Sequence, residues 1–224
     1  MERSNPEVLF PRLFPFWDAL SPQDRSALLD AACEETFPRG ARIADGGAAP
    51  GILFVRSGCL RLYLLSEEGR EVTLCRLFPG ELCVLAAAEP LRRLAKDLFT
   101  DAEEESDCVL IDGQCYAELA SRVPDARAFA LERAAERFSE ILRALEQILF
   151  TPFDKRLAAF LVKEAERGET DRVALTHEQI ARHLGSAREV VSRTLKRFAA
   201  ARLVEVSRKG VRILDRTGLL ALAG

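Results

Sequence analysis

One stretch near the C-terminus, residues 175–198, constrains the fold of this chain more than any other. Thr176, followed by Gln179 three residues later, forms a capping-box pattern that predicts the start of a helix. The predicted apolar face of that helix consists of Ile180, Ala181 and Leu184. Gly185 follows, where a sharp turn needs a residue without a Cβ. The pattern therefore predicts a short helix that ends in a tight turn.

A second helix is expected directly after that turn, with Ser186 as its N-cap and Glu189 three residues later. The residues spaced to face inward in it are Val190, Val191, Thr194, Leu195 and Phe198. Its remaining surface carries Arg188, Glu189, Ser192, Arg193, Lys196 and Arg197. Two helices joined by a short glycine turn are a helix-turn-helix pattern, in which the second helix enters the major groove of DNA.

The polar residues of the second helix suit recognition of base edges. An arginine can donate two hydrogen bonds to O6 and N7 of guanine, and a glutamate can accept one from N4 of cytosine. Glu189 and Arg193 are four residues apart, so they share one helix face and are expected to contact one G·C pair. The alternative is a solvated charged face on which the same two residues form an ordinary salt bridge.

A hairpin is predicted after the second helix. Residues 203–206 and 211–214 have strand-like patterns, and the turn between them is basic. Such a hairpin after a recognition helix is a wing, and Arg208 and Lys209 at its tip are expected to contact phosphates. The predicted DNA-binding set is completed by the two expected caps, Thr176 and Ser186.

Charge is distributed unevenly along the 224 residues. Residues 154–224 hold 15 Lys and Arg against 9 Asp and Glu, a net charge of +6, whereas residues 1–153 hold 17 against 26, a net charge of −9. This asymmetry predicts that only the C-terminal part meets a polyanion such as double-stranded DNA. The sequence shows neither a secretory signal nor a membrane-spanning run, so a cytoplasmic protein without a membrane partner is expected, with its 6 cysteines reduced.

The sequence pattern of the N-terminal half changes from helical to strand-like. Residues 1–35 are expected to form a short helical lead-in, with a helix start at Ser21. Between residues 36 and 110, short apolar runs alternate with glycine-containing turns. The predicted strands are 52–55, 59–65, 72–78 and 108–111. Short strands at this spacing, without long helices between them, predict an antiparallel β-roll or barrel.

A long helix is predicted over residues 124–150, with apolar residues recurring over about three heptads. The expected contacts of a coiled-coil homodimer are Leu131, Phe138, Ile141, Leu142, Leu145 and Ile148. The alternative is a helix packed only on its own β-roll. We favour the homodimer, because winged-helix proteins usually bind two half-sites. Pro152 ends this helix, and a further helix is expected over residues 153–168.

These elements predict an α+β protein in three parts. They are a β-roll sensor domain with N-terminal helices over residues 1–123, a dimerisation helix over 124–151, and a winged helix-turn-helix domain over 152–224. The sequence has no Walker-type loop and no nucleophile with a nearby base, so no enzymatic activity is expected. A DNA-binding module with an architectural rather than a promoter-regulatory role is the alternative to a regulator.

In this order of elements the chain resembles the CRP/FNR family of bacterial transcription regulators, which includes the cyclic-AMP receptor protein and the fumarate-nitrate regulator. The most specific motif is Arg188-Glu-Val-Val-Ser-Arg193, and the turns at residues 57–63, 68–71 and 78–81 also resemble the family. The resemblance implies a cyclic-nucleotide-binding-like, double-stranded β-helix as the sensor fold. It further implies an inverted-repeat operator, RNA polymerase as a partner, and base contacts by Glu189 and Arg193.

The sensor region departs from both branches of the family. The cyclic-nucleotide branch has a phosphate-binding cassette, in which the arginine of an Arg-Ser pair is the charge-assisted partner of the cyclic phosphate. Here residues 82–88 are apolar and no Arg-Ser pair follows them. Arg92 and Arg93 are basic but do not stand in such a cassette. Cyclic AMP is therefore not expected to bind. The cysteines show no C-x-x-C spacing, so neither an iron–sulfur cluster nor another metal site is expected. Both histidines, His177 and His183, lie in the DNA-binding part, which leaves haem only with a cysteine ligand.

The signal itself is unidentified. A haem or an apolar ligand beside residues 82–88 is one hypothesis. Thiol sensing is another, with Cys83, Cys75 and Cys59 as the candidates. The simpler interpretation of these cysteines is that they are small buried hydrophobes, because a thiol sensor needs both a lowered pKa and access.

Overall fold

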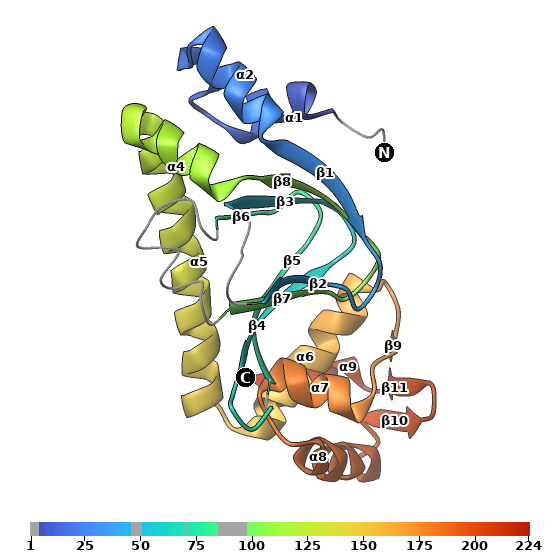
Figure 1. Ribbon diagram of the computed structural model, residues 1–224. Coiled ribbons are helices and arrows are strands. Elements are labelled where there is room, and N and C mark those ends of the chain that lie inside the picture. The colour runs from blue at the N-terminus through green and yellow to red at the C-terminus, as the bar shows by residue number, and fades with distance from the viewer. Residues whose placement is uncertain (1–4, 46–50, 70, 85–97) are drawn as a thin grey trace. The chain divides into compact units, whose positions relative to one another are not determined.

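The computed structural model describes residues 5–45, 51–69, 71–84 and 98–224 (Figure 1). Its residues group into two compact units, one formed by Met1–Leu65 with Leu74–Ile141 and the other by Ser66–Thr73 with Leu142–Gly224. None of the helices in the described part of the chain has the length and hydropathy needed to span a bilayer. The α+β architecture expected from the sequence is confirmed.

Three helices open the first unit: α1 (Pro6–Leu13), the 3-10 helix η1 (Trp17–Ala19) and α2 (Pro22–Asp30). The helix start predicted at Ser21 is confirmed, because its Oγ accepts a hydrogen bond from the Asp24 amide at 3.1 Å. The boundary expected at residue 36 is wrong. Strand β1 already begins at Ala32 (Ala32–Phe37), because its backbone pairs with a distant strand in antiparallel register.

Two four-stranded sheets form the β-roll. In spatial order, the first contains β1, β8 (Ser106–Ile111), β3 (Ile52–Ser57) and β6 (Leu82–Val84). The second contains β2 (Arg42–Asp45), β7 (Leu98–Ala102), β4 (Leu60–Leu65) and β5 (Glu71–Leu77). Pairing is antiparallel, as expected. The four predicted strands correspond to β3, β4, β5 and β8, whereas the other four strands were not anticipated.

Apolar side chains fill the interior of the roll. Leu53, Leu60, Leu62 and Leu77 are all fully buried there. Burying a leucine side chain contributes roughly 1.5–3 kcal/mol. This core therefore holds the two sheets together and fixes which face of each strand points outward.

Two helices follow the roll, and Figure 1 shows the second as one long helix. Helix α4 (Gly113–Arg122) was not predicted, although Asp112 caps it by accepting from the Cys115 amide at 2.8 Å. Helix α5 (Pro124–Phe150) has the bounds predicted from the heptad pattern. The buried hydroxyl of Tyr116 donates to the carbonyl oxygen of Ala126 at 2.9 Å, which joins the two helices.

The second unit contains a helical core and a small sheet. Its elements after α5 are α6 (Phe153–Arg167), β9 (Arg172–Val173), α7 (His177–Leu184), α8 (Arg188–Ala200), β10 (Val204–Ser207), β11 (Gly210–Ile213) and α9 (Arg216–Ala223). The sheet order is β10-β11-β9, so β9 extends the predicted hairpin to three strands. Helices α6, α7 and α8 meet through the fully buried side chains of Leu157, Ile180 and Leu195.

Candidate nucleic-acid interface

The start of α7 is fixed by the predicted capping box. The Thr176 amide donates to Gln179 Oε1 at 2.8 Å, and the Gln179 amide donates to Thr176 Oγ1 at 3.2 Å. At the other end, Gly185 has φ +57°, a left-handed conformation that favours glycine. The three residues predicted for the apolar face of this helix, Ile180, Ala181 and Leu184, are buried. The first half of the helix-turn-helix prediction is therefore confirmed.

The predicted cap of the second helix is wrong. Helix α8 begins at Arg188, and Ala187 occupies the N-cap position without a side-chain hydrogen bond. The Ser186 amide instead donates to the carbonyl oxygen of Ala181 at 2.9 Å, which closes the end of α7. Ser186 thus belongs to the turn, because the left-handed glycine directs the next amide back toward the preceding helix.

Helix α8 divides into a buried and an exposed side. Of the residues predicted to face inward, Val191, Thr194, Leu195 and Phe198 are buried and Val190 is half-buried. Of the predicted DNA-binding residues, Ser192 is half-buried, and Arg188, Glu189, Arg193, Lys196 and Arg197 are exposed. The helix therefore presents one polar surface while its apolar side is held in the core.

The exposed side chains of α8 differ in whether they have a partner within the chain. Arg197 forms an ion pair with Asp154 at 3.6 Å. Within the described ranges, Glu189 and Arg193 form neither a salt bridge with each other nor a side-chain hydrogen bond with another residue. The alternative of an ordinary 189–193 salt bridge is therefore not what the structure contains. Both groups are available to an external partner.

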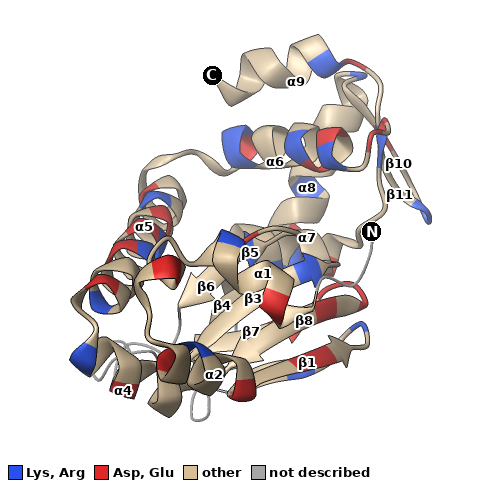
Figure 2. Cartoon of the chain, turned by 90° about the horizontal axis from the view of Figure 1, so that it is seen from above, with Lys and Arg blue, Asp and Glu red and all other residues tan. Residues whose placement is uncertain are grey.

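The wing is confirmed, with each strand shifted by one residue from its expected bounds. Strands β10 and β11 pair with Val206 opposite Val211, and Ser207 Oγ donates to the Gly210 carbonyl at 3.2 Å. Arg208 and Lys209 are exposed at the tip, which is basic in Figure 2. Arg212 in contrast pairs with Asp171 at 2.9 Å. Only the tip of the wing carries unneutralised charge from this hairpin.

A groove of about 290 Å³ separates the start of α7 from the wing. It is lined by Ala174, Leu175, Thr176, His177, Ser207, Arg208, Lys209 and Gly210. Burial, and secondarily the positive charge of Arg188, lowers the pKa of His177 below its ordinary value. The sequence prediction did not include His177 in the interface. The sequence feature that could have identified His177 is its place directly after the predicted cap Thr176, at the start of the helix-turn-helix.

The sensor-candidate cysteines lie in the β-roll. Cys59 and Cys83 are buried and Cys75 is half-buried. Burial raises the pKa of Cys75 to about 11 and that of Cys83 to about 12. These two thiols are therefore protonated at neutral pH, whereas a reactive thiol has a lowered pKa. The geometry favours the interpretation as small buried hydrophobes, and a sensing role for the three cysteines stays a prediction.

The predicted ligand segment is only partly described. Residues 82–84 form β6, whereas residues 85–88, together with Arg92 and Arg93, lie outside the described residues. One cation from α5 does reach this strand, since Arg137 donates to the carbonyl oxygen of Leu82 at 3.4 Å and pairs with Glu140 at 2.6 Å.

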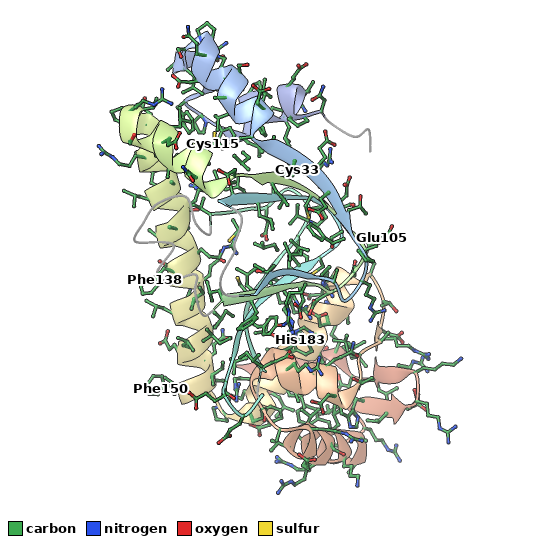
Figure 3. All side chains as sticks on the ribbon, viewed as in Figure 1. Cys33, Glu105, Cys115, Phe138, Phe150 and His183 are labelled. Atoms are coloured by element: carbon green, nitrogen blue, oxygen red, sulfur yellow. The ribbon has the colours of Figure 1, made fainter. Side chains whose placement is uncertain are left out.

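The predicted dimer residues on α5 fall into two groups. Leu131, Phe138 and Leu142 are exposed to 50%, 54% and 49%. Ile141, Leu145 and Ile148 are half-buried. Leu149 and Phe150 add further exposed apolar surface at the end of the helix, and Figure 3 labels Phe138 and Phe150 along it. Such a run of exposed apolar side chains on one helix is a candidate surface for association, and the dimer contact stays a prediction.

Comparison with known proteins first gives the class of the second unit. Residues 155–222 match the family model of the Crp-like helix-turn-helix domain. This range covers α7, the turn, α8 and the wing. The exposed polar side of α8 is therefore the surface of a DNA-binding domain.

Relatives that span the chain give the family. A structure from Eubacterium rectale, assigned to the CRP/FNR family of transcriptional regulators, is 33% identical, covers 95% of this chain and 99% of its own, and has a TM-score of 0.86. The anaerobic regulatory protein of Haemophilus influenzae is 28% identical over 80% of this chain and 71% of its own length. The cyclic AMP receptor protein of Thermus thermophilus is 26% identical over 86% of this chain and 88% of its own length. This chain belongs to the CRP/FNR family and is a DNA-binding transcription regulator.

Proposed function

We propose that the chain binds an inverted-repeat operator as a homodimer and that Glu189 and Arg193 contact one G·C pair in each half-site. The observation that carries this proposal is the exposure of both side chains on α8 without a partner among the described residues. An unpaired arginine retains its full set of donors for guanine, and the glutamate retains its acceptors for cytosine. In the manner of the family, the half-site is expected to contain a TGA core.

Nonspecific affinity comes from the cations around that pair. Arg188 and Lys196 on α8, with Arg208 and Lys209 on the wing, are exposed and are the proposed phosphate contacts. Arg197 is expected to contribute less, because Asp154 already neutralises part of its charge. The hydroxyl groups of Thr176, Ser186 and Ser192 are the predicted uncharged donors to the same backbone.

Helix α5 is the proposed dimer interface. Leu131, Phe138 and Leu142 are about half exposed in the single chain, and a second copy of α5 would cover them. Two recognition helices related by this contact would contact half-sites whose centres lie about one turn apart, ~34–36 Å. Ile148 has a second role, since its Cδ1 lies near Gly185 at the helix-turn-helix turn.

The remaining parts of the proposal rest on the family resemblance. RNA polymerase is the proposed protein partner, and the cytoplasm, where it meets chromosomal DNA, is the proposed site of action. The signal would act on the β-roll, without catalysis, through an apolar ligand, a haem or a thiol. An architectural protein is the alternative role. Genome-wide occupancy separates the two, because a regulator would occupy few promoter-centred sites and an architectural protein would cover the chromosome broadly.

Selection of binding sites from random duplexes, followed by titration of Arg193→Ala, tests the base contact. Loss of a bidentate arginine contact should cost about 1–3 kcal/mol on the selected site and relax the preference at the G·C pair. Lys163→Ala is the matched control, since it removes one exposed cation from α6 that is not among the predicted DNA-binding residues. An unchanged ratio of specific to nonspecific affinity in Arg193→Ala would show that this residue does not read sequence.

A further inference from the structure

The groove between α7 and the wing gathers basic groups from two separate elements. His177 lies on α7, and Arg208 and Lys209 lie at the wing tip. Among the described residues that line the groove, none is a carboxylate. A concave site of one sign of charge attracts an ion of the other sign. The groove therefore suits an anion that reaches both elements at once.

The charges around His177 come from each neighbouring element. Arg188 at the start of α8 opposes its protonation, and the wing contributes Arg208 and Lys209. Glu178, the next residue of α7, is the carboxylate adjacent to it in sequence and is exposed. The imidazole is half-buried, and burial is the largest cause of its lowered pKa. In the free protein, burial and the charge of Arg188 therefore favour the neutral form of His177.

We propose that the groove holds a backbone phosphate of bound DNA and that His177 takes up a proton as it contacts that phosphate. An anion close to an imidazole favours the charged form, which offsets burial and the neighbouring cations. The proposal rests on the proposed DNA-binding function and adds a ligand subsite and a regulatory variable to it.

The sign of the pH effect follows from this coupling. The complex holds His177 protonated up to a higher pH than the free protein does. Between the two pKa values the complex binds more protons, so DNA affinity rises as the pH falls through that window. The limit is about tenfold per pH unit for each proton taken up. Below the pKa of the free protein both states are protonated and the dependence disappears.

The chain supplies its own control, because it contains only 2 histidines. His183 lies near the other end of α7 and stacks on Phe160, with ring centroids 5.4 Å apart. Figure 3 labels His183. It is not one of the residues that line the groove. Replacing each histidine in turn therefore separates the groove from a general effect of titrating an imidazole.

The experiment measures fluorescence anisotropy of the full chain on a selected operator and on a random duplex from pH 5.5 to 8, at constant ionic strength. The parent and His183→Gln should both gain affinity as the pH falls, and His177→Gln should lose that dependence. His177→Arg, which is charged throughout, should also show no pH dependence. An equal slope in His177→Gln and the parent, or a slope abolished by His183→Gln, would overturn the inference.

A second measurement keeps the test valid if a variant folds poorly. Calorimetric titration of the parent in two buffers of different ionisation enthalpy counts the protons taken up on binding. Proton uptake is expected in the pH range where the affinity of the parent depends on pH, and it should shrink when Arg208 and Lys209 are both replaced by Ala. No uptake by a parent that binds its operator would refute the protonation of His177 on binding and leave the proposed function intact. No DNA binding by the parent at any pH would instead refute the proposed function.

Discussion

Charged side chains are arranged in opposite ways in the β-roll and in helix α8. In the roll, the buried guanidinium of Arg56 joins three neighbouring strands, because it pairs with Glu34 at 2.6 Å and Asp107 at 3.3 Å. On α8, Glu189 and Arg193 have no such partners in the described part of the chain. Cations paired inside the chain stabilise the fold, whereas unpaired ones remain available for DNA. Pairing, more than charge count, therefore separates the residues expected to stabilise the fold from those proposed to bind DNA.

The same contrast holds within one short hairpin. Arg212 on β11 is paired with Asp171 and more distantly with Glu205, at 2.9 and 3.9 Å. Arg208 and Lys209 at the tip are exposed and lie on the groove. Three basic residues that look equivalent in the sequence are thus expected to behave differently.

The largest expected effect concerns an unpartnered apolar group instead of an unpartnered charge. Phe138→Glu should yield monomers that bind the operator poorly, because the proposed interface would then bury a charge without a partner. Light scattering measures the mass, and Glu132→Ala, at another exposed position on α5, is the control. A dimer of unchanged mass would remove α5 from the proposed interface.

The next effect tests the paired side of the comparison. Arg56→Ala should lower the free energy of unfolding by about 2 kcal/mol, less than for a fully buried pair because both carboxylates are partly exposed. Chemical denaturation measures it, with the exposed Arg39→Ala as the control. The ratio of specific to nonspecific DNA affinity should not change. A shift in that ratio would mean that paired charges of the roll also serve recognition.

A smaller effect sharpens the comparison inside the wing. Arg208→Ala should weaken binding to all sequences alike and reduce the salt slope by about 1 for each subunit, since one phosphate contact is lost. Arg212→Ala should leave the slope unchanged, because Asp171 already neutralises that guanidinium. Titrations at several salt concentrations distinguish the two. Equal slopes for both variants would contradict the assignment of phosphate contact to the tip.

The smallest expected signal is the absence of cyclic AMP binding. This expectation rests on residues 86–90, which lie outside the described residues. Their sequence offers Glu89 where a cyclic phosphate needs a cation. Isothermal titration should show no heat at micromolar concentrations of cyclic AMP. Saturable micromolar binding would show that an arginine from elsewhere serves the phosphate.

Much of the fold could be predicted from local sequence patterns. The heptad pattern predicted α5 with its observed bounds, and the capping box at Thr176 located α7. The elements that were not predicted from the sequence form through contacts with residues distant in the chain. Strand β9 has two residues and owes its form to pairing with β11. Helix α9 contains Gly218 and is held by Leu219, which is buried in the core shared with α6.

Strand β1 shows why the boundary predicted at residue 36 was wrong. Glu34 and Glu35 are disfavoured in strands, so the sequence there resembles the end of a helix. Pairing with β8 overrides that preference, and Arg56 compensates the charge of Glu34. At the interface, exposure of Glu189 and Arg193 followed from helical periodicity, whereas the groove around His177 forms only when the wing folds back beside α7.

The two-residue strand β9 fixes the position of the wing on its own domain. Val211 and Arg212 of β11 pair with it, and Gly210 approaches the carbonyl of Val173 so closely that a side chain would not fit. The segment that leads into α7 thus holds β11 along its length as far as Gly210, directly beside the tip that bears Arg208 and Lys209. The backbone of the tip is therefore preorganised beside the start of α7, and it has little conformational entropy left to lose if it contacts a phosphate.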